Sequence, residues 1–127
     1  MSQVPENLLY TKTHEWVRQE NDDTLTVGMT DNAQSLLGDV SQVTLPKINS
    51  TLKAGAHCCT VESVKAATDI YAPVDGKVIA INPALKENAK GINSDPYGKG
   101  WLFKIKPSKE VITERFLDAK AYKKIEL

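Results

Sequence analysis

Apolar and polar residues alternate along much of the chain, a pattern that predicts a protein built mainly of β-strands. Residues 14–19 and 24–29 both show this alternation, and Asn21-Asp22-Asp23 between them supplies the short polar side chains that favour a turn. These two segments are therefore expected to form a hairpin. Further strands are predicted at residues 39–45, 56–64, 67–71, 76–82 and 101–106.

A short helix is predicted after the first hairpin. Thr30, Asp31 or Asn32 can cap it, because a side-chain oxygen there accepts from the free amides of the first turn. The helix is expected to end at Leu37, since Gly38 suits the left-handed residue that follows many helices.

The last third of the chain predicts one loop and one helix. Residues 83–100 are expected to form a long loop, because they are rich in turn-forming residues and show no sustained period. After Pro107, Ser108 can cap a final helix that packs over one end of the sheets. Its apolar face would include Val111, Ile112, Phe116 and Leu117.

Composition and charge narrow the class of protein. A chain of 127 residues, 41% of them hydrophobic, can bury a core as one domain spanning residues 1–127 without disulfides or metal. Sixteen basic residues balance sixteen acidic ones, so no nucleic-acid partner is expected. The longest aliphatic run covers only residues 78–81, and neither a membrane span nor an export signal is predicted.

The two cysteines are adjacent, at Cys58 and Cys59, and so cannot close a loop by bridging each other. This usage fits a reducing compartment. On a strand, one thiol is expected to be buried and the other to point outward. The histidines, His14 and His57, lack the spacing of a metal site.

The central segment carries the clearest chemical signal. It reads Glu62-Ser63-Val64-Lys65-Ala66-Ala67-Thr68-Asp69, and predicted strands flank it on both sides. Lys65 is therefore expected at the tip of a tight hairpin with its amine in water, where it could be acylated. Because Lys65 is one of fourteen lysines, composition alone favours an ordinary solvated surface charge over a modified residue.

The stretch Glu62-Ser63-Val64-Lys65-Ala66 resembles the lipoyl-attachment site of the glycine cleavage H-protein family. The likeness extends over nearly the whole chain. Residues 46–50 depart from the family by lacking the glycine that is common in that turn. Further segments that resemble the family are residues 10–17, 28–34, 37–39, 94–101 and 117–122.

The resemblance implies a sandwich of two antiparallel sheets, a hybrid like lipoyl and biotinyl domains, with short helices including one at the C-terminus. It implies lipoate in amide linkage to Lys65 and a carrier that is not itself an enzyme. The partners it implies are glycine decarboxylase, which uses pyridoxal phosphate, a folate-dependent aminomethyltransferase, and dihydrolipoamide dehydrogenase. A lipoate ligase or a lipoyl/octanoyl transferase would attach the group. The location implied is the cytoplasm of a bacterium, or the mitochondrial matrix for a processed eukaryotic chain.

The resemblance also suggests roles for four other residues. Glu62, three residues before the lysine, and Gly76, eleven after it, resemble recognition features of lipoylated domains. Glu15 and Asp69 match positions that resemble the lining of a groove in which the loaded arm docks. Each has a plain alternative, because strand carboxylates are commonly solvated and a glycine after Val-Asp commonly serves a turn.

Other functions remain open at this point. A biotin carrier is disfavoured because Val64 and Ala66, not methionines, flank the lysine. A lipoyl module of a 2-oxo acid dehydrogenase would have a long linker, and a lipoyl relay protein that serves other enzymes is not excluded. A hydrolase using Asp22, Asp23 or Glu15 would need converging carboxylates in a pocket.

Overall fold

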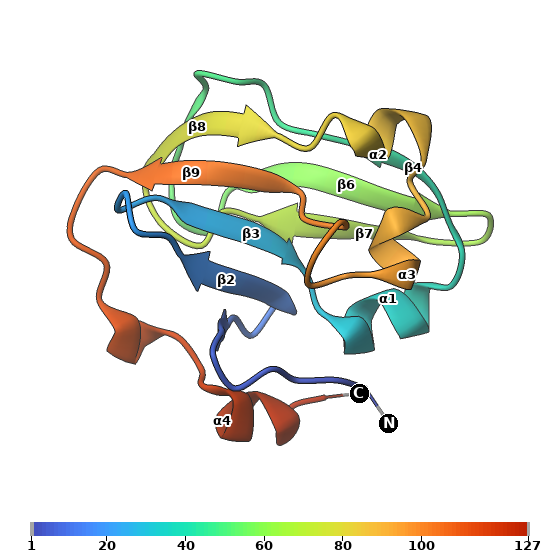
Figure 1. Cartoon of the computed structure of the whole chain (residues 1–127), viewed down its shortest axis with the longest axis horizontal. Coiled ribbons are helices and arrows are strands. Elements are labelled where there is room, and N and C mark those ends of the chain that lie inside the picture. Colours follow the sequence, from blue (N-terminus) through green and yellow to red (C-terminus); the bar gives the residue numbers. More distant parts are fainter. Residues whose placement is uncertain (1, 127) are drawn as a thin grey trace.

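The computed structural model describes residues 2–126, which form two antiparallel sheets with short helices between and after the strands (Figure 1). The larger sheet has six strands in the order β1-β2-β3-β9-β8-β5, and the smaller has three in the order β4-β6-β7. The strands of the larger sheet are β1 (Leu9–Tyr10), β2 (Glu15–Gln19), β3 (Leu25–Met29), β5 (Thr51–Leu52), β8 (Gly76–Ile81) and β9 (Phe103–Pro107). Those of the smaller sheet are β4 (Val40–Thr44), β6 (His57–Ser63) and β7 (Ala67–Tyr71). The expected mainly β sandwich is confirmed.

The two sheets share one hydrophobic core between their inner faces. Val27 of β3 lies opposite Phe103 of β9, and both side chains are fully buried. From the smaller sheet, Val61 and Ile70 belong to the same cluster. Because successive strand residues point to opposite faces, this alternation leaves the other side of β6 and β7 facing water.

A second cluster covers the far side of β1 and β2. Tyr10 of β1 pairs with Trp16 of β2, and both side chains are fully buried there. Tyr122 of helix α4 (Ala119–Lys123) stacks on Tyr10 with ring centroids 4.8 Å apart. The C-terminal helix therefore docks on an aromatic patch of the larger sheet.

Helix α1 (Asp31–Leu37) begins and ends as its sequence predicts. The Thr30 hydroxyl accepts a hydrogen bond from the Ala33 amide at 3.2 Å. Gly38 ends the helix at a φ of 90°, a backbone conformation that disfavours residues with a Cβ.

Two predictions about the last third of the chain are wrong. Residues 83–100 are not one loop, because helices α2 (Ala84–Glu87) and α3 (Gly91–Ser94) form there. Each has only four residues, too short for a visible period, and each buries one apolar side chain, Leu85 or Ile92.

The final helix also begins later than predicted. Ser108 caps no helix, and the segment after it holds only the short 3-10 turn η1 (Thr113–Arg115). Asp118 caps α4 instead, by accepting from the Ala121 amide at 2.8 Å. Val111 and Phe116 reach the main core from irregular backbone, so their apolar spacing reflects packing and not a helix.

Candidate functional site

Lys65 lies at the tip of the β6–β7 hairpin, as predicted. Ser63 and Ala66 close the turn, since the Ser63 amide donates to the Ala66 carbonyl at 2.8 Å and the Ala66 amide donates to the Ser63 hydroxyl at 3.2 Å. Only Val64 and Lys65 stand between them, and Val64 is 93% exposed. The lysine is exposed too, so its amine extends into solvent from a fixed base.

The corner between α1 and β4 lies beside the lysine. A methyl group at Gly38 would lie 3.9 Å from Cε of Lys65. Asn93 of α3 holds this corner: its Oδ1 accepts from the Val40 amide at 2.8 Å, and its Nδ2 donates to the Gly38 carbonyl at 3.0 Å. The surface next to Lys65 is therefore held in place by hydrogen bonds from helix α3.

Glu62 and Asp69 point to the same face of the smaller sheet. Thr60 pairs with Asp69 and Glu62 pairs with Ala67, so these side chains lie on the outer face, away from buried Val61. Asp69 is exposed and also meets His57, whose Nε2 lies 3.3 Å from Asp69 Oδ1. Strand alternation could have placed Glu62 and Asp69 together, but the His57 contact depends on an irregularity in the register.

Glu15 is buried, with 1% of its surface exposed. Its Oε1 accepts from the hydroxyls of Thr11 and Thr13, each at 2.6 Å. Its Oε2 accepts from the Tyr71 amide at 3.2 Å, which joins the start of β2 to the edge strand β7. Burial raises the pKa of the Glu15 carboxyl, and these hydrogen bonds oppose that rise. The expected solvated carboxylate is therefore not found at Glu15.

A groove of about 600 Å³ opens beside Glu15, and we call it the Glu15 groove. It lies at the end of β7 that is remote from Lys65, and Asp69 is not among its lining residues. The structure thus brings Glu15 close to the β7 backbone two residues beyond Asp69, but places the two carboxylates on different surfaces. The lining residues are Tyr10, Thr11, Lys12, Thr13, Glu15, Gly55, Tyr71, Ala72, Pro73, Arg115, Phe116 and Leu117.

Gly76 stands apart from the other predicted site residues. It is the first residue of β8, and Figure 1 shows β8 beginning at the opposite end of the long axis from the β6–β7 turn. A Cβ at Gly76 would lie 2.4 Å from the backbone oxygen of Lys106 in β9. The position therefore requires glycine for close strand packing, a reason that the sequence alone does not reveal.

The cysteine prediction needs a correction. The register of β6 shifts between His57 and Cys59, so the strand has an extra residue at Cys58 relative to β7. Cys59 is buried as expected, but Cys58 also packs against the core, and its thiol donates to the Ile70 carbonyl at 3.5 Å. Burial raises the pKa of Cys58 to about 12 and raises that of Cys59 as well. Neither thiol is activated for redox chemistry.

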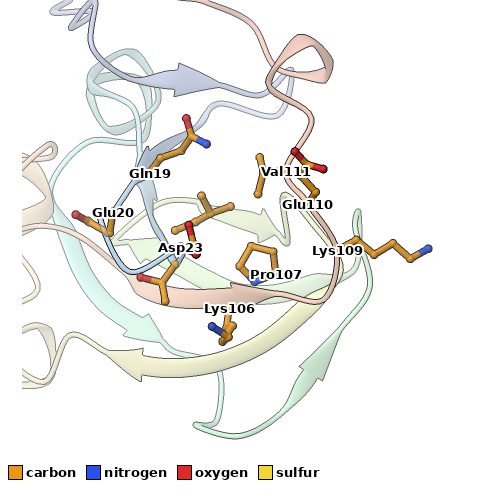
Figure 2. A pocket seen from close by; sticks show the side chains of 10 residues that line it. Gln19, Glu20, Asp23, Lys106, Pro107, Lys109, Glu110 and Val111 are labelled. Carbon is orange, nitrogen blue, oxygen red and sulfur yellow. The ribbon is translucent and has the colours of Figure 1, made fainter.

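A hollow of about 500 Å³ lies between the β2–β3 turn and the segment after β9 (Figure 2). Both acidic and basic side chains line it, and the Lys109 side chain points away from it. None of the predicted site residues lines it. Its lining residues are Gln19, Glu20, Asp23, Thr24, Leu25, Lys106, Pro107, Lys109, Glu110 and Val111.

Between residues 2 and 126, no three His, Cys, Asp or Glu side chains gather in a way that could hold a metal ion. No helix in this described part is long and apolar enough to cross a membrane.

Comparison with known proteins gives a consistent result. The family model described as glycine cleavage H-protein matches residues 8–126. The chain is 54% identical over 122 residues to the glycine cleavage system H protein of Cronobacter sakazakii, covering 96% of this chain and 95% of that protein. The glycine cleavage system H protein of Escherichia coli K12 matches with the same identity and coverage.

A solved structure agrees. The crystal structure of a glycine cleavage system H protein from Mycobacterium marinum is similar with a TM-score of 0.84 and 34% identity, covering 94% of this chain and 95% of that one. The family match runs from the strands that hold Glu15, through the hairpin that presents Lys65, to helix α4. The chain therefore belongs to the glycine cleavage H-protein family, the non-catalytic lipoyl carriers of the glycine cleavage system.

Proposed function

We propose that Lys65 carries lipoate in amide linkage to its side-chain amine. The observation that supports this is the hairpin tip, where a closed two-residue turn presents an exposed amine on a fixed base. A modifying enzyme can reach such an amine without unfolding the carrier, so the residues present fit the group. When bound, lipoate supplies a disulfide that accepts both electrons and the aminomethyl group of glycine.

The partners follow from that chemistry. The carrier would receive the aminomethyl group at glycine decarboxylase, deliver it at the folate-dependent aminomethyltransferase, and be reoxidised by dihydrolipoamide dehydrogenase. The protruding tip, with polar surroundings and one strongly exposed apolar side chain at Val64, suits brief contacts with several proteins. The relatives from Cronobacter sakazakii and Escherichia coli are bacterial, which supports a cytoplasmic carrier.

Glu62 is proposed to contact the lipoate ligase or lipoyl/octanoyl transferase directly. It lies on the outer face of β6 next to the turn, and it pairs with Ala67 across the hairpin. Its carboxylate is only partly buried, so it can accept hydrogen bonds from the modifying enzyme. Gly76 is proposed to support recognition indirectly, because keeping β8 close to β9 stabilises the folded carrier that the modifying enzyme needs.

Glu15 and Asp69 are proposed to receive the cationic amine of the loaded arm. Thr13 is exposed, and its hydroxyl donates to Glu15 while its oxygen can still accept from an ammonium group. The negative charge of Glu15 can therefore act through Thr13 although the carboxylate itself is covered. Because Lys12 and Arg115 also line the Glu15 groove, an arriving cation there needs the negative charge of Glu15, while Asp69 would receive the amine on the outer face of the hairpin.

Lipoylation of one lysine tests the central proposal. The parent, Lys65→Arg and Lys77→Arg would each be incubated with a lipoate ligase, lipoate and ATP, and their intact masses measured. Lys77 is the matched control because it is exposed on strand β8, outside the hairpin. The parent and Lys77→Arg should gain one lipoyl group, and only they should support glycine decarboxylation. A lipoyl group on Lys65→Arg would disprove the assignment.

Storage of the loaded carrier tests the proposed roles of Glu15 and Asp69. Glu15→Ala and Asp69→Ala should accept the aminomethyl group normally, yet lose it to water faster than the parent when the folate enzyme is absent. Equal loss from all three proteins would indicate an arm that moves freely in solvent.

A further inference from the structure

The outer face of the β6–β7 hairpin carries a compact polar cluster that we call the His57 cluster, formed by His57, Thr60 and Asp69. His57 Nε2 lies 2.8 Å from Thr60 Oγ1 and 3.3 Å from Asp69 Oδ1. The Thr60 hydroxyl is also 3.5 Å from the same carboxylate oxygen. Three side chains from two paired strands thus meet at one ring nitrogen.

The chemistry of the three groups determines which atom donates the hydrogen bond. A carboxylate only accepts hydrogen bonds, so a ring nitrogen that faces one must carry a hydrogen. His57 can therefore donate from Nε2 to the cluster while its ring is neutral. A second proton, on Nδ1, adds a positive charge without breaking that contact.

The surroundings hold the ring in this orientation. Tyr71, which is paired with His57 across the hairpin, meets the imidazole edge to face with centroids 6.3 Å apart and planes at 72°. On this outer face, the ionisable residues of β7 are Asp69 and Tyr71. Besides His57 itself, β6 contributes Glu62 to the same face. Strand β4, on the other side of β6, has no ionisable side chain between Val40 and Thr44. Asp69 is thus the carboxylate that His57 contacts.

We propose that His57 is a positioning residue for Asp69: it fixes the carboxylate on the outer face of the hairpin and, once protonated, competes with the cationic arm for it. This inference rests on the proposed role of Asp69 in receiving the amine. A neutral His57 leaves the full charge of Asp69 for an ammonium group, whereas a charged His57 neutralises much of it. Retention of the aminomethyl group should therefore be weaker with a charged His57 than with a neutral one.

The size of the effect is modest because both side chains are about half exposed, at 53% and 54%. Ion pairs at such exposure typically change an equilibrium by about two- to fivefold. Added salt should reduce the effect, because exposed charges are screened.

The test compares the loss of the aminomethyl group to water in the parent and in His57→Gln at pH 8 and pH 5.5. Glutamine keeps an N–H donor within reach of Asp69 but gains no charge. The two proteins should match at pH 8, while at pH 5.5 the variant should lose the group about two- to fivefold more slowly. Lys53→Gln, which removes an exposed cation shortly before β6, should keep the parent's pH dependence. A constant ratio of parent to His57→Gln at both pH values would overturn the competition.

Asp69→Asn separates this inference from the proposed function. In an Asp69→Asn background, His57→Gln should have no effect on the loss at either pH. If Asp69→Asn by itself leaves the loss unchanged, the docking role of Asp69 fails. The contact between His57 and Asp69 is then tested on the unmodified protein. A double-mutant cycle of the parent, the two single variants and the double variant gives the coupling between the two residues from thermal unfolding. Coupling that is stronger at pH 5.5 than at pH 8 supports the charged pair, and zero coupling at both refutes it.

Discussion

Replacing Gly76 by alanine separates a structural requirement from a recognition role. The new Cβ would lie 2.4 Å from the Lys106 carbonyl oxygen and 3.0 Å from Cγ1 of Ile105. The first contact is with backbone inside a paired strand, so β8 and β9 must move apart or the pairing must distort. Overpacking of this kind costs about 1–3 kcal/mol. Alanine also lowers the conformational entropy of the unfolded chain, which stabilises the fold by roughly 0.5–1 kcal/mol. The net destabilisation is therefore about 1–2 kcal/mol.

For a domain of this length, about 2.1 cal/mol/K per residue of unfolding entropy converts that loss into a Tm lower by about 4–8 °C. Thermal unfolding followed by circular dichroism measures it, with Lys77→Ala at the next, exposed position as the control. Well below both transitions, Gly76→Ala should be lipoylated at close to the parent's rate, because Gly76 lies far from the hairpin tip. An unchanged Tm would refute the packing argument, and slow lipoylation of fully folded protein would indicate direct recognition.

Three further predictions follow from burial. Phe103→Ala should cost about 3–5 kcal/mol in urea unfolding, because its ring is fully buried between the sheets, whereas Lys65→Arg should cost less than about 0.5 kcal/mol; similar losses would contradict the hairpin placement. Because burial raises the pKa of Glu15 above its ordinary value of 4.5, the stability of the parent relative to Glu15→Gln should be greatest below that value and decline as pH rises through the folded-state pKa. Urea midpoints at several pH values measure this, and a gap that grows with pH would oppose it. A thiol reagent at pH 8 should label neither Cys58 nor Cys59 until the protein unfolds, since burial raises the pKa of both thiols; rapid labelling of native protein would contradict their packing.

The sequence predicts the longer strands well because apolar and polar residues alternate along them, as they do around the buried Val61 of β6 and Ile70 of β7. It does not predict β1 or β5, whose two residues each are too few to show a period. In the turn before β5, Asn49 has a φ of 74°, a left-handed conformation that asparagine tolerates better than most residues.

The site is predictable where it depends on local order and not where it depends on distant partners. Lys65 follows from two strands and a short turn that are continuous in sequence. Glu15 does not, because its burial depends on Thr11 and Thr13 on one side and on Tyr71, far along the chain, on the other. The His57 contact with Asp69 likewise needs the extra residue at Cys58, which no simple alternation shows.

The position of β9 between β3 and β8 has a consequence for synthesis on the ribosome. Strand β3 is complete when residue 29 has been made, but its second neighbour is not available until residues 103–107 emerge. Pairings between segments so far apart in sequence form slowly, because the chain loses the entropy of closing a long loop before the stabilising contacts form. The β6–β7 hairpin needs only residues 57–71 to be present. Nascent chains that stop before β9 should therefore hold the lysine turn transiently at most, and a modifying enzyme that needs the folded carrier must wait until almost the whole chain has left the ribosome.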